Sequence, residues 1–146
     1  MMLTAIHRRV AALNQGQDPT LVARLPSGWA VLGDPQVLSG YCLLLPDPVV
    51  PHLNALDAHA REAFLGDMAR LGDAVLAVSG ALRCNYAIFG NLEPALHAHV
   101  FPRFIDEPQE LRAANPWAYD WAAAPRFSTQ MHAGLQSRLR AALLNS

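Results

Sequence analysis

The sequence predicts an α+β fold in which a long helix covers one face of an antiparallel sheet. Short apolar segments at 29–32, 41–45, 83–89 and 95–104 have the length and composition of strands. Residues 57–79 form one amphipathic segment, long enough as a helix to cross a whole sheet. The connections within each neighbouring pair of strand segments are short, which favours antiparallel pairing.

Length and composition indicate a globular protein. With 146 residues, 52% of them hydrophobic and 16% charged, the chain is expected to form a single domain over 1–146. The net charge of −1 argues against non-specific attraction to nucleic acid or to a membrane, so neither is expected as a partner. All 11 basic residues are arginine, which leaves Arg, His and backbone N–H groups to bind anions.

The sequence favours a cytoplasmic location. The first six residues are followed directly by His7, Arg8 and Arg9, a pattern that does not predict a signal peptide. No apolar run approaches the ~18 residues that a membrane span needs. Cys42 and Cys84 lie in strand-like apolar surroundings and are interpreted as reduced core thiols.

The N-terminal half contains a short helix and two strands. Thr4 is a suitable N-cap for a helix over 4–14. Residues 21–27 are interpreted as an irregular or helical connection. A strand over 29–32, a turn at 33–35 and a strand over 41–45 follow, and the two strands are expected to pair antiparallel. The second strand lacks polar alternation, which is typical of a central strand.

The remaining helices are predicted from their caps and their spacing. Asp57 is a plausible N-cap of the long helix, and Ser79 and Gly80 end it. Its core positions and its outer positions separate at helical spacing. The core positions are Phe64, Met68, Leu71, Val75 and Val78, and the outer positions are Arg61, Asp67, Arg70 and Asp73. Residues 129–144 are expected to form a C-terminal amphipathic helix.

The segment 95–104 carries the most informative pattern in the chain. Side chains at i and i+2 of a strand point to the same side. His97 and His99 therefore share a face with Ala95, Phe101 and Arg103, while Leu96, Ala98 and Val100 form an apolar face suited to a core. Core packing alone does not account for two imidazoles on one face.

Two chemistries fit this pair of histidines. A neutral imidazole is a good nucleophile near pH 7, and attack of His97 on phosphorus would give a covalent phosphoramidate. Gly90 and Asn91 supply a loop that can approach a phosphate closely and an amide donor. Asn85 is either a polar residue at a strand edge or a substrate-binding residue across the hairpin from the histidines. Asp34 is either a turn residue or an acceptor for ribose hydroxyls.

The alternative is a metal site. His-x-His on a strand also serves as a two-ligand unit for zinc or iron, which needs a third protein ligand. Cys84, His52, Asp34 and Glu93 are ligand types available in the chain, but no spacing selects one of them.

The segment 96–103, Leu-His-Ala-His-Val-Phe-Pro-Arg, resembles the signature of the histidine triad (HIT) family, His-φ-His-φ-His-φ-φ continuing into Pro-Arg. Residues 85–91 resemble the strand and Gly-polar loop that precede the triad, and 40–46 resemble the family's Pro-Gly-His-x-Leu strand. The similarity covers a core of about 29–108, with 109–146 as a C-terminal extension. It implies a HIT-like antiparallel sheet with the long helix on one face and additional N- and C-terminal helices.

The resemblance implies an enzyme, a nucleotide hydrolase or transferase that acts at an α-phosphate. It assigns the nucleophile to His97 and substrate binding to His99 and Asn91, with Asp34 near the ribose. Together with the residues found above, the predicted site comprises catalytic His97 and substrate-binding His99, Asn91, Gly90, Asn85 and Asp34. Dinucleoside polyphosphates or nucleoside phosphoramidates are the implied substrates, with no cofactor or metal, and the protein is expected to be a homodimer.

Three positions depart from the family pattern. Ala95 stands at the first triad position. Tyr41 stands where a histidine often follows the glycine that opens the central strand, and Ser39 stands where a proline precedes that glycine. Since the first histidine is not the nucleophile, the covalent step remains open to this chain. A nucleotide-binding module that has lost catalysis is the alternative within the same family.

Overall fold

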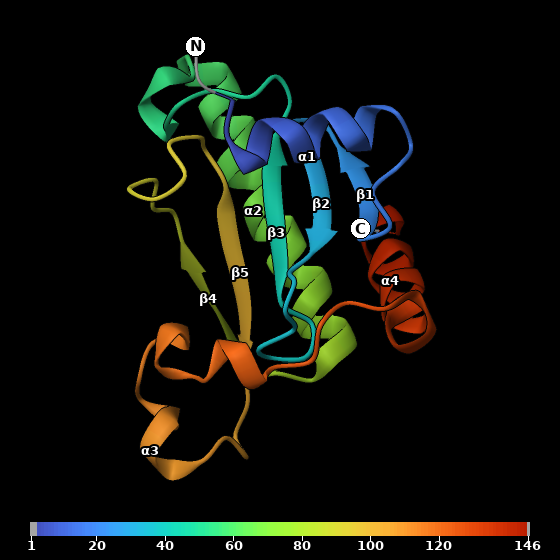
Figure 1. Ribbon diagram of the computed structural model, residues 1–146, viewed down its shortest axis with the longest axis vertical. Coiled ribbons are helices and arrows are strands. Elements are labelled where there is room, and N and C mark those ends of the chain that lie inside the picture. The colour runs from blue at the N-terminus through green and yellow to red at the C-terminus, as the bar shows by residue number, and fades with distance from the viewer. Residues whose placement is uncertain (1–2, 146) are drawn as a thin grey trace.

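The computed structural model describes residues 3–145 and contains a five-stranded antiparallel sheet between helices (Figure 1). The sheet order is β1-β2-β3-β5-β4. The strands are β1 (Leu21–Leu25), β2 (Gly28–Leu32), β3 (Cys42–Pro46), β4 (Arg83–Ala87) and β5 (Ala98–Arg103). The helices are α1 (Ala5–Asn14), α2 (Ala58–Ser79), α3 (Gln109–Arg112) and α4 (Thr129–Leu144), with short 3₁₀ turns η1 (Leu53–Ala55), η2 (Pro116–Ala118) and η3 (Trp121–Ala123). This architecture confirms the predicted α+β class.

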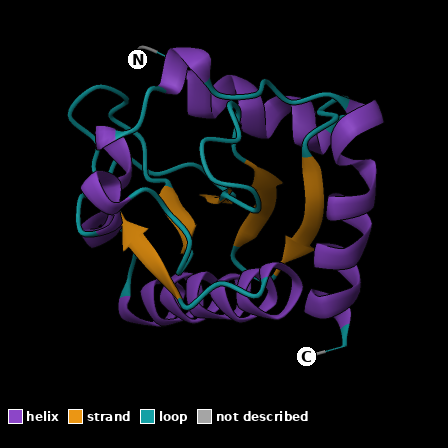
Figure 2. Cartoon of the chain, turned by 90° about the horizontal axis from the view of Figure 1, so that it is seen from below, coloured by secondary structure: helices purple, strands orange, loops and turns teal. Residues whose placement is uncertain are grey.

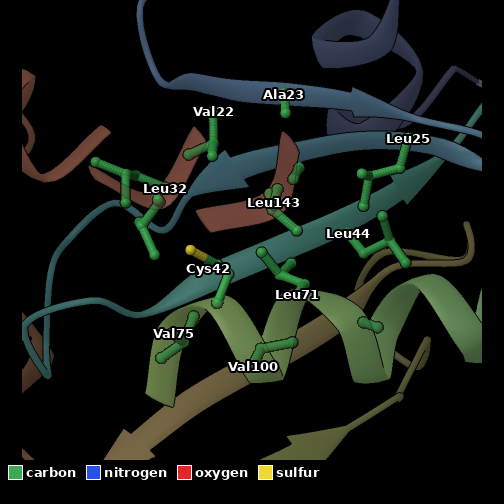
Figure 3. Close-up of a cluster of buried hydrophobic side chains, with 14 of the residues drawn as sticks. Val22, Ala23, Leu25, Leu32, Cys42, Leu44, Leu71, Val75, Val100 and Leu143 are labelled. Atoms are coloured by element: carbon green, nitrogen blue, oxygen red, sulfur yellow. The ribbon is translucent and has the colours of Figure 1, made fainter. Parts of the chain in front are cut away.

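The sheet separates two layers of helices, with α1 on one face and α2 on the other (Figure 2). The predicted pairing of the second and third strands is confirmed, because β2 and β3 are antiparallel with Ala30 opposite Leu44. All five residues of β3 are buried, which explains the absence of polar alternation in its sequence. The larger core lies between the sheet and α2, where Cys42, Leu44, Leu71 and Val75 meet (Figure 3).

Helix α2 begins and ends where its sequence predicts. The Asp57 carboxylate accepts a hydrogen bond from the Ala60 N–H at 2.8 Å, and Gly80 ends the helix in the left-handed conformation with φ 72°. One predicted outer position is wrong. Asp67 is 5% exposed, and its carboxylate accepts a hydrogen bond from the Ser27 N–H at 2.8 Å. The Asp67 carboxylate therefore binds the β1–β2 turn and does not face solvent.

Helix α1 confirms the helix predicted at the N-terminus. The Thr4 hydroxyl accepts hydrogen bonds from the N–H groups of Ile6 and His7, and the Thr4 N–H donates to Nδ1 of His7. This reciprocal arrangement is a capping box with histidine in the role usually taken by Glu or Gln. Helix α1 packs its apolar residues on the sheet face opposite α2.

The interpretation of 21–27 as an irregular or helical connection is wrong, because β1 is a strand paired with β2. Its free edge is covered by α4. The Gln136 side chain donates to the carbonyl of Leu21 at 2.9 Å, and Arg140 Nε donates to the carbonyl of Val22 at 2.7 Å. These donors lie more than a hundred residues away along the chain, so the local pattern of 21–27 did not reveal them.

Strands β4 and β5 pair antiparallel as predicted, with Ala87 opposite His99. Both are shorter than expected, and His97 lies just before the first residue of β5. The predicted alternation of faces is confirmed: Leu96, Ala98 and Val100 join the core under α2, whereas Ala95 and Phe101 join the cluster on the α1 face. Among residues 3–145, no helix is both long enough and apolar enough to span a membrane.

Replacing Asp67 tests whether its buried carboxylate supports the β1–β2 turn. Asp67→Ala leaves the Ser27 N–H without its acceptor, so we expect a loss of ~1–3 kcal/mol in the free energy of unfolding. Asp73→Ala on the exposed side of the same helix is the control, with an expected change within ~0.5 kcal/mol. Urea unfolding measures both, and equal losses would contradict the role of Asp67.

Candidate active site

A cavity of about 530 Å³ lies beside the two histidines. Its wall comprises His97 and His99, the loop residues 89–93, and Asn115, Trp117 and Trp121 from the segment after β5. The structure thus brings together four of the six predicted site residues, Gly90, Asn91, His97 and His99. This volume is in the ordinary range for sites that bind small molecules and cofactors.

The backbone fixes the orientation of His97. Its Nδ1 lies 2.7 Å from the carbonyl oxygen of Ala95. A carbonyl only accepts, so Nδ1 carries the proton, and the lone pair of the neutral ring is on Nε2. Because His97 is only 9% exposed, its ring has little freedom to leave this orientation. A buried imidazole with a defined lone pair at a cavity wall has the geometry of a nucleophile or a general base.

His99 is held by Tyr41, the residue just before β3. The Tyr41 hydroxyl lies 2.8 Å from Nδ1 of His99, and the rings of His97 and His99 meet edge to face at 5.1 Å between centroids. The pKa of His99 is lowered to about 4, mainly by burial and to a smaller extent by the nearby His97. His99 is therefore neutral at pH 7, and one of its nitrogens is a donor while the other is an acceptor.

Aromatic side chains form the apolar wall of the cavity. Trp117 lies edge to face with His99 at 5.1 Å and stacks on Trp121 at 5.9 Å, both between centroids. Phe89, which is 59% exposed, lies edge to face with Trp117 across the rim. Trp117 and Trp121 therefore pack against each other and also line the cavity.

A buried ion pair holds the segment that carries these tryptophans. Arg103, at the end of β5, binds Glu107 at 2.9 Å and donates to the carbonyl of Ala114 at 2.8 Å. The Tyr119 hydroxyl donates a short hydrogen bond to the same Glu107 carboxylate. Burial alone would raise the pKa of Glu107, but hydrogen bonds from Arg103, Tyr119 and the Phe104 N–H outweigh it and lower the pKa.

The other two predicted residues do not line this cavity. The side-chain Oδ1 of Asn85 accepts a hydrogen bond from Arg103 at 2.7 Å, so the Asn85 amide belongs to the ion-pair network at the far end of β5. The Asp34 carboxylate accepts a hydrogen bond from the Phe127 N–H at 2.9 Å and binds Arg126 at 3.1 Å. Their assignment to substrate binding stays a prediction.

The site contains residues that sequence reasoning missed. Tyr41 was noted only as a departure from a family pattern, and Asn115 and Glu93 were not assigned to substrate binding. The Glu93 carboxylate accepts a hydrogen bond from the Ala5 N–H at 3.1 Å, which links the cavity loop to the start of α1. The closely spaced aromatic residues at 117, 119 and 121 were the one available signal that the segment after β5 has a defined conformation.

Among the described residues, the histidine pair has no third ligand beside it that would complete a metal site. Within residues 3–145, no group of three or more His, Cys, Asp or Glu side chains lies close enough together to hold a metal ion. The Cys42 and Cys84 thiols are free, and burial raises the pKa of both, which disfavours the thiolate form that metals bind.

Removing the charge of Glu107 should release the segment after β5. Glu107→Gln leaves the Arg103 guanidinium buried without its counter-ion, for an expected loss of ~3–5 kcal/mol in the free energy of unfolding. Glu110→Gln, on the exposed side of α3, is the control and should stay within ~0.5 kcal/mol. Urea unfolding followed by tryptophan fluorescence measures both, and a small loss in Glu107→Gln would contradict the anchoring role.

His99 should make stability depend on pH. Its pKa is about 4 in the folded protein and ordinarily about 6.5, so the unfolded chain binds more protons between these values. The stabilisation is complete above pH 6.5 and is lost as the pH falls towards 4, with a slope below ~1.4 kcal/mol per pH unit.

Urea unfolding at pH 6.5, 6.0, 5.5 and 5.0 measures this slope. We expect His99→Phe to remove it in part, and His52→Ala, which replaces an exposed histidine, to retain it. An identical slope in His99→Phe and the unaltered chain would contradict the assignment.

Comparison with known proteins identifies the fold. No protein-family model matches the chain, and no curated protein matches it. A histidine triad protein from Marinobacter aquaeolei superimposes with a TM-score of 0.73 at 19% identity, covering 99% of this chain and 98% of its own. A histidine triad protein from Bradyrhizobium japonicum gives 0.72 at 20%, covering 84% and 89%. A hypothetical histidine triad nucleotide-binding protein from Sulfolobus tokodaii gives 0.74 at 14%, covering 94% and 92%. The chain therefore has the fold of histidine triad proteins, as its sequence predicted.

Proposed function

We propose that the chain binds a nucleotide and cleaves it at the α-phosphate, as a hydrolase or transferase, through a transient nucleotidyl group on His97. The observation that carries this proposal is the hydrogen bond from Nδ1 of His97 to the Ala95 carbonyl, at the wall of the cavity. It leaves the Nε2 lone pair as the nucleophile without requiring any side chain at position 95.

The reaction has two displacements at phosphorus. In the first, the Nε2 lone pair of His97 forms a P–N bond, and the bond from phosphorus to the leaving group breaks with its electrons, after which the leaving group takes a proton. In the second, water or another acceptor attacks the same phosphorus, loses a proton, and displaces the imidazole. His99, neutral and beside His97, is placed to donate a hydrogen bond to the oxygens around phosphorus.

The wall of the cavity supports a nucleotide as substrate. The backbone and amide groups of Gly90 and Asn91 provide neutral donors on the loop side, where no lysine exists to bind phosphate. Phe89 from the same loop, with Trp117 and Trp121 from the segment after β5, provides apolar ring surface that suits a planar base or another flat group. The Sulfolobus neighbour named as nucleotide-binding is consistent with this class.

The family resemblance narrows the substrate to dinucleoside polyphosphates or nucleoside phosphoramidates. It also supports a homodimer and a cytoplasmic location, both of which stay predictions. For the metal-dependent alternative, residues 3–145 place no third His, Cys, Asp or Glu side chain close enough to complete a metal site with the histidine pair.

Trapping the intermediate tests the proposal. The purified protein is mixed with a dinucleoside polyphosphate or a nucleoside phosphoramidate, denatured at neutral or alkaline pH because a phosphoramidate is labile to acid, and examined by peptide mass spectrometry. We expect one nucleotide-sized mass on the peptide that contains His97, and at least ~10³-fold slower turnover in His97→Ala. His52→Ala replaces an exposed histidine away from the cavity and should turn over at the unaltered rate.

The same assay separates enzyme from binding module. Turnover that survives in His97→Ala would overturn the covalent mechanism. Micromolar binding of the nucleotide to the unaltered chain, with no turnover and no adduct, would instead establish the binding-only alternative. Ala95→His is a poor test of that alternative, because Ala95 is fully buried and a larger side chain would overpack the cluster, at a cost of ~1–3 kcal/mol.

A further inference from the structure

We propose that Tyr41 is a positioning residue for His99. Its buried hydroxyl donates a hydrogen bond to Nδ1 of His99 and holds the neutral ring in the tautomer that carries its proton on Nε2. The chemical purpose of this arrangement rests on the proposed function, since Nε2–H would then donate towards a phosphate beside His97. The tautomer itself can be measured without any substrate.

The Tyr41 ring has a fixed position. It is 2% exposed, stacks on Phe101 with 4.3 Å between centroids and an interplanar angle of 12°, and meets Trp121 edge to face at 5.7 Å. A Cβ at Gly33 would lie 2.2 Å from two carbons of the same ring, so the glycine makes room for it. The hydroxyl oxygen therefore cannot move away from His99 without disturbing this packing.

The direction of the hydrogen bond follows from counting protons. The neutral His99 ring could donate from Nδ1 to the Tyr41 oxygen, or accept from the Tyr41 hydroxyl. Burial raises the pKa of Tyr41, so its hydroxyl keeps its proton. His99 is the one hydrogen-bond partner recorded for that hydroxyl among the described residues, and a buried donor without an acceptor is unfavourable. Donation by Tyr41 satisfies both groups, whereas the reverse direction leaves the hydroxyl proton unpaired.

The hydrogen bond from Tyr41 determines which nitrogen of His99 can donate into the cavity. With Nδ1 accepting from Tyr41, the second ring nitrogen of His99 is a donor, and His99 lines the cavity next to His97. The two histidines then have complementary roles at one phosphate, because His97 presents a lone pair and His99 presents an N–H. Tyr41 stands where the family resemblance leads one to expect histidine, so this means of setting the tautomer is a property of the present chain.

Nitrogen-15 NMR of the histidine rings at pH 7 tests the tautomer in the unaltered protein. We expect His99 to show a protonated Nε2 and an unprotonated Nδ1, and the Tyr41 hydroxyl proton to exchange slowly and lie close to Nδ1 of His99. A proton on Nδ1 of His99 would overturn the proposal. This spectrum decides the matter even if no variant at position 41 folds.

Tyr41→Phe provides the second measurement, with Tyr86→Phe as its matched control, because Tyr86 lies on the opposite face with its hydroxyl against α2 at Gly72. We expect the preference of His99 for Nε2–H to fall about fivefold in Tyr41→Phe and to stay unchanged in Tyr86→Phe. An unchanged preference in Tyr41→Phe would show that the hydroxyl does not set the tautomer.

Turnover on a nucleotide separates this inference from the proposed function. We expect kcat of Tyr41→Phe to fall about tenfold, with KM within about twofold, if His99 donates mainly in the transition state. A changed tautomer with an unchanged kcat would overturn the catalytic purpose of Tyr41. If the unaltered protein turns over no nucleotide, the proposed function fails, while the NMR spectra still decide the role of Tyr41.

Discussion

The site depends on the buried ion pair between Arg103 and Glu107. A guanidinium has five N–H donors, and leaving it buried without partners would be strongly unfavourable. Here Glu107, Asn85 and the carbonyls of Leu111 and Ala114 accept its hydrogen bonds, so the end of β5 organises a segment that has little regular structure of its own. That segment carries Trp117 and Trp121, and without it the histidines would face an open sheet instead of a cavity. The ion pair thus holds in place the segment that closes the cavity beside the two histidines.

Local signals predicted most of the helices and the central part of the sheet. The Asp57 cap and the Gly80 stop define α2, the Thr4 cap begins α1, and the unbroken apolar run of β3 indicates a central strand. Each of these depends on neighbours within a few residues, which a sequence displays directly. The alternation around His97 and His99 is equally local, so both the shared face of the histidines and the apolar face under α2 could be predicted.

Contacts between distant segments account for what the sequence did not reveal. Strand β1 pairs with β2, and α4 covers its other edge through Gln136 and Arg140, partners that no pattern within 21–27 indicates. Asp67 is charged like a surface residue, but its carboxylate is buried and accepts a hydrogen bond from the turn before β2. Asn85 has the chemistry of a site residue, but Arg103 is its partner. In each case a polar side chain satisfies a distant backbone or charged group, which spacing along the chain does not encode.

Ala95 shows that the backbone alone can orient His97. What His97 needs from position 95 is a carbonyl oxygen, and every residue supplies one. Ala95 is fully buried in the same cluster as Tyr41 and Phe101, so a small side chain there is compatible with the dense packing on that face. The aromatic ring at position 41 occupies that face and reaches His99 with its hydroxyl. Ala95 and Tyr41 therefore leave one histidine oriented by a backbone carbonyl and the other by a tyrosine hydroxyl, which is a coherent geometry for a site with two histidines.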